Sequence, residues 1–294
     1  MKNDINNNQT ATLRKLLNSH ELIIMPCCYD GLSAKLIQDA GFNLTFMSGF
    51  AVSAARLGLP DTGLISYGEM ADQLKNICSA IKIPVIADGD TGYGNAVNVK
   101  RTVHGYIQAG AAGIMIEDQK SPKRCGHTSG KEVIERKDAV IRLKAAIEAQ
   151  KEALDNGKDI VIMARTDARA TLGLDEAIER AKIFNDMGAD ILFVEAPCSE
   201  EEMEIICIKA PGCHMANMVE HGKTPVLTPV RLAELGYKIA AYPLTLLSAS
   251  VYAMKMALSK LAKGESNNAI MDFKELQTII GFSEYDETLK RLEK

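Results

Sequence analysis

The sequence predicts an α/β fold in which eight parallel strands alternate with helices and close into a (β/α)₈ barrel. Eight short apolar runs recur along the chain, with amphipathic stretches between most of them. Each run is continuously apolar, which is typical of a parallel strand covered on both faces. The first run continues into CCYDGLSAK, which lacks the GxGxxG turn of a dinucleotide-binding fold. A closed barrel is therefore favoured over an open doubly wound sheet.

The elements follow in chain order. The predicted strands are the apolar runs at 22–26, 43–48, 84–88, 113–117, 160–165, 190–195, 214–218 and 238–243. The predicted helices are the amphipathic stretches at 31–40, 67–82, 96–109, 136–155, 174–187, 200–209 and 228–236.

Two segments lie outside this alternation. Residues 119–134 form a long polar loop after the fourth strand, and residues 245–294 are mostly helical beyond the eighth. We find no internal repeat, low-complexity linker or domain boundary. We therefore expect one barrel domain over 1–294, with 245–294 as a helical C-terminal extension that serves assembly.

Composition excludes two classes of partner and indicates a compartment. The 294 residues carry a net charge of −4, which provides no basic face for nucleic acid. No run of 18 apolar residues occurs, so we expect no membrane span. The seven cysteines are odd in number and show no CxxC pair, which indicates free thiols in a reducing, cytoplasmic environment.

Polar residues end most of the predicted strands. In a (β/α)₈ barrel the C-terminal ends of the strands converge at one mouth, where active sites lie. We therefore expect a functional site there, built from Ser48-Gly49, Asp88-Gly89-Asp90, Glu117-Asp118, Arg165-Thr166-Asp167, Glu195, Asn217 and Tyr242-Pro243.

Asp88, Asp90 and Glu117 are the candidate metal ligands. Three carboxylates at one mouth repel each other unless a cation or protons intervene. Oxygen ligands without His or Cys suit Mg²⁺ or Mn²⁺. The alternative is structural: Asp90 caps the next helix and Asp88 binds backbone amides in the turn.

The segment PKRCGH, residues 122–127, contains the most distinctive thiol. Cys125 lies beside Lys123, Arg124 and His127, and such a cationic setting is expected to lower a thiol pKa. Gly126 allows the segment to move, so we expect a lid over the mouth. The alternative is an exposed basic loop with an incidental cysteine.

These motifs together resemble the isocitrate lyase/phosphoenolpyruvate mutase superfamily. The resemblance rests on SG at 48–49, LGLPD at 57–61, DGDTGYG at 88–94, KRCGH at 123–127, ARTDA at 164–168 and YPL at 242–244. It covers the whole barrel. It implies a homotetramer in which each subunit exchanges its last barrel helix with a neighbour.

The resemblance also implies roles for the acidic and carboxylate-binding residues. Ser48 and Gly49 would hold an α-keto acid carboxylate, with Arg165 as its cationic partner. Asp88 would ligate Mg²⁺ directly. The metal's surroundings would be completed, partly through water, by Asp61, Asp90 and Glu117.

The lid residues receive roles in the same way. Cys125 would protonate the departing carbanion, which favours carbon–carbon lyase chemistry. Lys123, Gly126 and His127 would shape the closed lid. Glu195 and Asn217 would help to bind the carboxylate of the second product and to order the lid.

The expected substrate is a 2-alkylmalate such as 2,3-dimethylmalate, cleaved to pyruvate and propanoate. Thr128-Ser129-Gly130 follow KRCGH, where the methylisocitrate lyases that this chain resembles usually have Arg-Pro-Asn. The chain also has Thr245-Leu246-Leu247-Ser248 where they tend to carry an arginine. Two fewer cations suggest fewer substrate carboxylates. A 2-methylisocitrate lyase, an oxaloacetate hydrolase or decarboxylase, and a non-catalytic barrel remain as alternatives.

Overall fold

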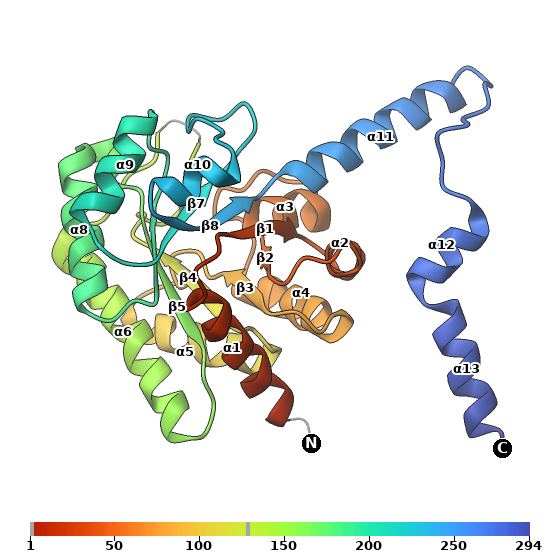
Figure 1. Ribbon diagram of the computed structural model, residues 1–294, viewed down its shortest axis with the longest axis horizontal. Helices are drawn as coiled ribbons and strands as arrows, with labels where there is room; N and C mark the ends of the chain where they lie inside the picture. The colour runs from red at the N-terminus through yellow and green to blue at the C-terminus, as the bar shows by residue number, and fades with distance from the viewer. Residues whose placement is uncertain (1–2, 128–129) are drawn as a thin grey trace. The chain divides into compact units, whose positions relative to one another are not determined.

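The first compact unit of the protein is a closed barrel of eight parallel strands. The computed structural model describes residues 3–127 and 130–294, with residues 3–7 described as backbone only. The described chain divides into two compact units, Met1–Thr245 and Leu246–Lys294. The first contains strands β1 to β8 in sequential order, and β8 pairs back onto β1 (Figure 1). The predicted fold class is thus confirmed.

Every strand begins and ends within two residues of its predicted bounds. The strands are β1 Ile23–Cys28, β2 Thr45–Met47, β3 Val85–Asp88, β4 Gly113–Glu117, β5 Val161–Thr166, β6 Ile191–Val194, β7 His214–Asn217 and β8 Tyr237–Tyr242.

The seven predicted helices of the barrel are present, and others were not foreseen. The predicted ones are α2 Gly31–Asp39, α4 Tyr67–Ala80, α5 Ala96–Ala109, α6 Arg136–Asp155, α8 Leu174–Asp186, α9 Glu200–Lys209 and α10 Pro229–Glu234. The others are α1 Asn3–Leu17, α3 Gly49–Val52, the π-helix η1 Ser53–Leu57 and α7 Ala168–Leu172. In the part of the chain that the structure describes, no helix combines the length and apolar character needed to cross a membrane.

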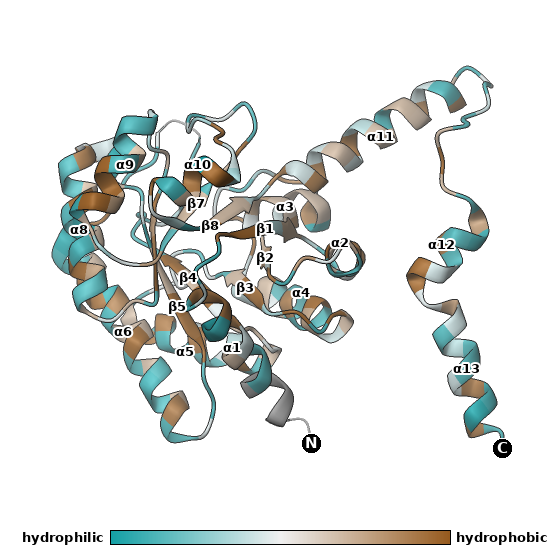
Figure 2. Ribbon diagram, viewed as in Figure 1, coloured by the Kyte–Doolittle hydropathy of each residue, from teal (hydrophilic) through white to brown (hydrophobic). Residues whose placement is uncertain are grey.

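The barrel interior is filled by side chains from the strands and from α1. Leu13 of α1 is fully buried in the cluster that includes Met25, Met163 and Ile239. The strands are largely brown in Figure 2, inside helices that mix teal and brown. Burying each such side chain stabilises the fold by about 1.5–3 kcal/mol. With the interior packed, the strand ends remain for polar residues.

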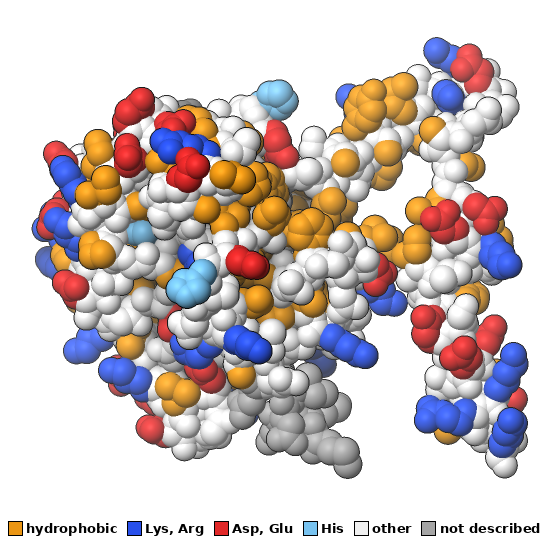
Figure 3. Space-filling view, in the orientation of Figure 1, with side chains coloured by type: hydrophobic (Ala, Val, Ile, Leu, Met, Phe, Trp, Pro, Cys, Tyr) orange, Lys and Arg blue, Asp and Glu red, His pale blue; other side chains and the backbone are white. Residues whose placement is uncertain are grey.

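The second compact unit contains helices that bury no side chain of their own. It comprises α11 Thr245–Leu261, which starts at the last residue of the first unit, α12 Phe273–Ile280 and α13 Phe282–Leu292. Large apolar side chains are exposed on all three, including Met254, Phe273 and Leu289. Figure 3 shows apolar side chains gathered along α11. That 1–294 acts as one domain with this extension stays a prediction.

Candidate active site

A cavity opens at the C-terminal ends of the strands, where the sequence places the site. Its empty volume is about 650 Å³, open solvent included. Thirteen residues are assigned a role above, and ten of them line it: Ser48, Asp61, Asp88, Lys123, Cys125, Gly126, His127, Arg165, Glu195 and Asn217. Gly49, Asp90 and Glu117 lie beside these residues without lining the cavity. Apolar side chains, among them Phe46, Met115 and Phe193, make up much of the remaining wall.

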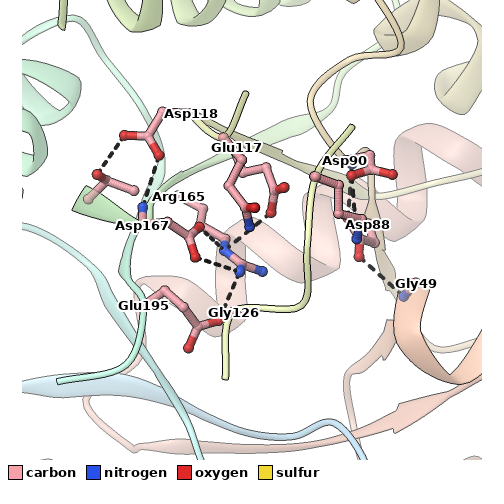
Figure 4. A network of polar contacts seen from close by, with 12 residues as sticks. Gly49, Asp88, Asp90, Glu117, Asp118, Gly126, Arg165, Asp167 and Glu195 are labelled. Carbon is pink, nitrogen blue, oxygen red and sulfur yellow. Dashed lines mark hydrogen bonds and ion pairs between the residues drawn. The ribbon is translucent and has the colours of Figure 1, made fainter. Parts of the chain in front are cut away.

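Asp88 at the end of β3 is held by backbone amides. Its Oδ1 accepts a hydrogen bond from the Asp90 amide at 2.9 Å, and its Oδ2 accepts one from the Gly49 amide at 3.2 Å (Figure 4). A Cβ at position 49 would collide with the Asp88 carboxylate, so the contact requires glycine. The structural alternative for Asp88, that it binds backbone amides, is therefore confirmed as a contact. The alternative for Asp90 is wrong, because Asn95 caps α5.

Lys123 brings a positive charge among the buried acids. Its Nζ lies 2.8 Å from Asp61 Oδ1 and 3.4 Å from Asp90 Oδ1. Burial raises the pKa of Asp90 to about 6, although Lys123 opposes the shift. Burial also raises the pKa of Glu117 well above its ordinary value. One lysine therefore does not fully offset the acids on this side of the mouth.

The acidic side has oxygens without a hydrogen bond. Among the described residues, the buried oxygens that accept no hydrogen bond include Asp61 Oδ1, Asp90 Oδ1 and Glu117 Oε1, although Lys123 Nζ lies within ion-pair distance of the first two. No group of three or more His, Cys, Asp or Glu side chains in the described ranges is arranged to hold a metal ion. The acids here nevertheless offer carboxylate oxygens, which are the kind of ligand that a hard divalent cation prefers.

Arg165 joins the acids on the other side of the mouth. Its Nε lies 2.8 Å from Asp167 Oδ2 and 3.3 Å from Glu117 Oε2, while its outer nitrogen Nη2 lies 3.2 Å from Glu195 Oε2 (Figure 4). Gly126 of the loop lies directly against this group, since a Cβ there would collide with Arg165 and Glu195. Glycine at position 126 thus allows the loop to approach Arg165 and Glu195 this closely.

Glu195 connects the loop to strand β7. His127 Nε2 lies 3.1 Å from Glu195 Oε1, and Asn217 Nδ2 lies 3.3 Å from Glu195 Oε2. His127 Nδ1 accepts a hydrogen bond from the Lys223 amide, so the neutral ring carries its proton on Nε2. Burial would raise the pKa of Glu195, but Arg165 and His127 lower it to about 2. Glu195 is therefore a carboxylate at neutral pH.

The expected effect on Cys125 is wrong in sign. Burial raises the pKa of the Cys125 thiol, and Glu195 adds to the shift. Arg165 lowers the pKa without reversing the shift. Of the cations adjacent in sequence, Lys123 pairs with Asp61, His127 faces Glu195 and Arg124 is exposed. The thiol is therefore protonated at neutral pH, which is the state that an acid requires.

Comparisons with known proteins identify the family of this chain. The family model described as phosphoenolpyruvate phosphomutase matches residues 13–262. The chain belongs to the phosphoenolpyruvate mutase/isocitrate lyase superfamily. It is 42% identical to 2,3-dimethylmalate lyase of Eubacterium barkeri, over 96% of this chain and 94% of that one. It is 38% identical to 2-methylisocitrate lyase of Aeropyrum pernix, over 93% and 88%. With these lyases as relatives, this superfamily member is an enzyme of the carbon–carbon lyase class.

Solved structures of the superfamily have the same fold. Oxaloacetate acetylhydrolase in complex with 3,3-difluorooxalacetate superposes with a TM-score of 0.92 at 34% identity, covering 97% of both chains. Phosphonopyruvate hydrolase in complex with oxalate and Mg²⁺ superposes with a TM-score of 0.85 at 29% identity, covering 97% of this chain and 99% of that one.

Two buried residues of this superfamily member are given no role by its sequence. Asp167 was noted at the end of β5 but given no role, and it proves to pair with Arg165. Lys131 is buried against Asp167, yet in the sequence it is one more basic residue in a polar loop. The one sequence signal that could have indicated Lys131 is its position five residues after Gly126. Thr128 and Ser129, which bear on substrate choice, lie outside the described residues.

Proposed function

We propose that the enzyme is a Mg²⁺-dependent lyase that cleaves a 2-alkylmalate, with 2,3-dimethylmalate giving pyruvate and propanoate. The observation that carries the proposal is the half-buried Cys125 thiol, which lines a cavity together with Arg165 and apolar side chains. A cation suits a substrate carboxylate, and the apolar wall suits the methyl groups of the substrate.

The substrate carboxylates are assigned to two groups. Arg165, with Ser48 and Gly49 at the start of α3, takes the carboxylate that becomes part of pyruvate. Ser48 is buried and lines the cavity, and the Gly49 amide points to Asp88. Asn217, hydrogen-bonded to Glu195, takes part in binding the carboxylate of propanoate.

Mg²⁺, or Mn²⁺ in its place, fits the acidic side of the mouth. Asp88 would bind it directly, with Asp61, Asp90 and Glu117 around it. The unbonded oxygens of Asp90 and Glu117 are the observation that supports this donor set. When bound, the ion offsets the negative charge that develops on the α-keto acid product.

The next step is the transfer of a proton from Cys125 to the substrate. A carboxylate of the acidic side takes the proton of the C2 hydroxyl, and cleavage of the C2–C3 bond leaves the electron pair on C3, beside its carboxylate. The Cys125 Sγ–H delivers its proton to C3, which completes propanoate and leaves a thiolate. After product release, solvent takes the proton from the carboxylate of the acidic side and restores the thiol proton. Lys123, Gly126 and His127 form the lid that excludes water in the meantime.

A substrate panel tests the proposal. Pyruvate release, coupled to lactate dehydrogenase, is measured with 2,3-dimethylmalate, 2-methylisocitrate and isocitrate, and acetate release is measured with oxaloacetate. We expect kcat/KM to be highest with 2,3-dimethylmalate. Preference for 2-methylisocitrate or oxaloacetate would replace the proposed substrate, and no turnover of any of them would contradict the proposed substrate class.

We further propose a cytoplasmic homotetramer in which the last barrel helix is exchanged between subunits. Helices α11–α13 bury none of their side chains, and exposed apolar side chains of this size favour a protein partner. The barrel also exposes Ile24 of β1 and Leu32 and Leu36 of α2. Light scattering at micromolar concentration is expected to give a tetramer mass, and a monomer mass would contradict the proposal.

A further inference from the structure

A buried lysine joins the lid to the cluster around Arg165. The lid is taken here as the segment Pro122–His127. Lys131 Nζ donates hydrogen bonds to the Gly126 carbonyl at 2.6 Å and to Asp167 Oδ1 at 2.7 Å. The Lys131 side chain is 2% exposed and that of Asp167 is fully buried. A charged contact this deep in the protein is costly to leave incomplete.

Asp167 is shared between two cations. Its Oδ2 accepts from Arg165 Nε at 2.8 Å, and its Oδ1 accepts from Arg165 Nη2 at 3.1 Å as well as from Lys131. Its backbone amide is fixed by Asp118 at 2.9 Å. The Asp167 carboxylate therefore cannot move with one cation without losing its bond to the other. The positions of Lys131 and Arg165 thus depend on each other.

Lys131 lies next to a fixed point of the loop. Two residues later, Val133 forms an isolated antiparallel bridge with Gln119. Gln119 also holds the lid backbone, because its side chain bonds both the amide and the carbonyl of Arg124. Lys131 therefore sits at the base of the lid and reaches Gly126, which packs directly on Arg165 and Glu195.

We propose that Lys131 is a positioning residue that latches the lid closed through the Gly126 carbonyl and holds Arg165 in place through Asp167. The lid then closes at the same time as Arg165 takes the orientation that binds a carboxylate. The effect on turnover rests on the proposed function, whereas the latch itself does not.

The test compares Lys131→Met with Lys120→Met. Both residues lie in the same loop, but Lys120 makes an exposed ion pair with Glu132 and serves as the control. Two properties are measured: the rate at which an arginine-specific protease cleaves after Arg124 in the full chain without substrate, and kcat and KM for pyruvate release. Lys131→Gln and Lys131→Arg are measured beside them.

We expect Lys131→Met and Lys131→Gln to be cleaved at least about tenfold faster than wild type, and KM to rise by a similar factor. Lys131→Arg should recover much of both properties, and Lys120→Met should match wild type. Unchanged cleavage in Lys131→Met and Lys131→Gln would overturn the latch, even if their melting temperatures fall. Failure of Lys131→Arg to recover KM would overturn the link to Arg165. If the wild type turns over no substrate, the proposed function fails while the cleavage result still decides on the latch.

Discussion

The two ends of the barrel both contain ion pairs, and they differ in how completely the charged groups are bonded. At the N-terminal end, Arg14 of α1 bonds Asp159 before β5 and Asp190 before β6, with contacts of 2.6 and 2.7 Å. The remaining oxygen of Asp190 accepts from Gln150 and from the Ile162 amide. At the mouth, Asp90 Oδ1 and Glu117 Oε1 accept no hydrogen bond, and burial raises the pKa of both groups.

The comparison separates stability from function. A completely bonded network stabilises the fold, because removing one member leaves the others unsatisfied. Acids that keep unbonded oxygens contribute less to stability than fully bonded ones, and they indicate groups that complete their bonding with a ligand. The same substitution should therefore have opposite consequences at the two ends.

The largest effect is expected from an Asp→Asn substitution made once at the mouth and once at the N-terminal end of the barrel. Asp88→Asn removes the proposed direct ligand of the metal and should lower kcat/KM by about 10³-fold or more. Since Asp88 also accepts hydrogen bonds from two backbone amides, of which Asn keeps one, we expect it to cost about 1 kcal/mol of unfolding free energy as well. Asp159→Asn breaks a pair with Arg14 and should cost about 1–3 kcal/mol of unfolding free energy, with kcat/KM unchanged. Urea unfolding and the pyruvate assay are run on both variants. Loss of stability in Asp88→Asn without loss of activity would reverse the assignment of the two ends.

The second effect concerns the thiol at the mouth. Cys125→Ser keeps the shape of the side chain but replaces the thiol with a hydroxyl that gives up its proton far less readily. We expect kcat to fall about 10²–10⁴-fold, the usual contribution of general acid catalysis, with pyruvate binding retained. Cys198→Ser, at an exposed position, is the control. Activity of Cys125→Ser within a few fold of wild type would leave Cys125 with a packing role only.

The smallest effect concerns a histidine at the N-terminal end. His214 begins β7, and burial lowers its pKa below the ordinary value of 6.5. Below pH 6.5 the unfolded chain binds this proton more readily than the folded chain, so its contribution to stability is present above that pH and is lost as the pH falls. We expect the unfolding free energy of His214→Gln to decline less than that of wild type between pH 7 and pH 5. Parallel pH profiles for the two proteins would show that His214 does not contribute to acid sensitivity.

The sequence predicted the strands and most of the mouth for one physical reason. Continuous apolar runs mark parallel strands, and the polar residues that follow them must meet at one end of a closed barrel. The same reasoning could not reach the sign of the Cys125 pKa shift, because burial outweighs the charged neighbours that the sequence displays.

Helix α1 and Lys131 were missed for related reasons. The start of α1 is mostly polar, so the sequence does not indicate that Leu13 is buried in the barrel interior. Lys131 acquires its role from Asp167, which lies 36 residues further along the chain. Contacts of this kind depend on tertiary packing, which no local pattern displays.

The most direct test of the central claim is pyruvate release from 2,3-dimethylmalate by the wild-type enzyme before and after chelation. The account predicts turnover with Mg²⁺, loss of turnover after exhaustive chelation, and recovery when Mg²⁺ or Mn²⁺ is added. The metal content is measured in the same samples. Full activity in samples without detectable metal would contradict the assignment of the acidic side of the mouth as a cation site.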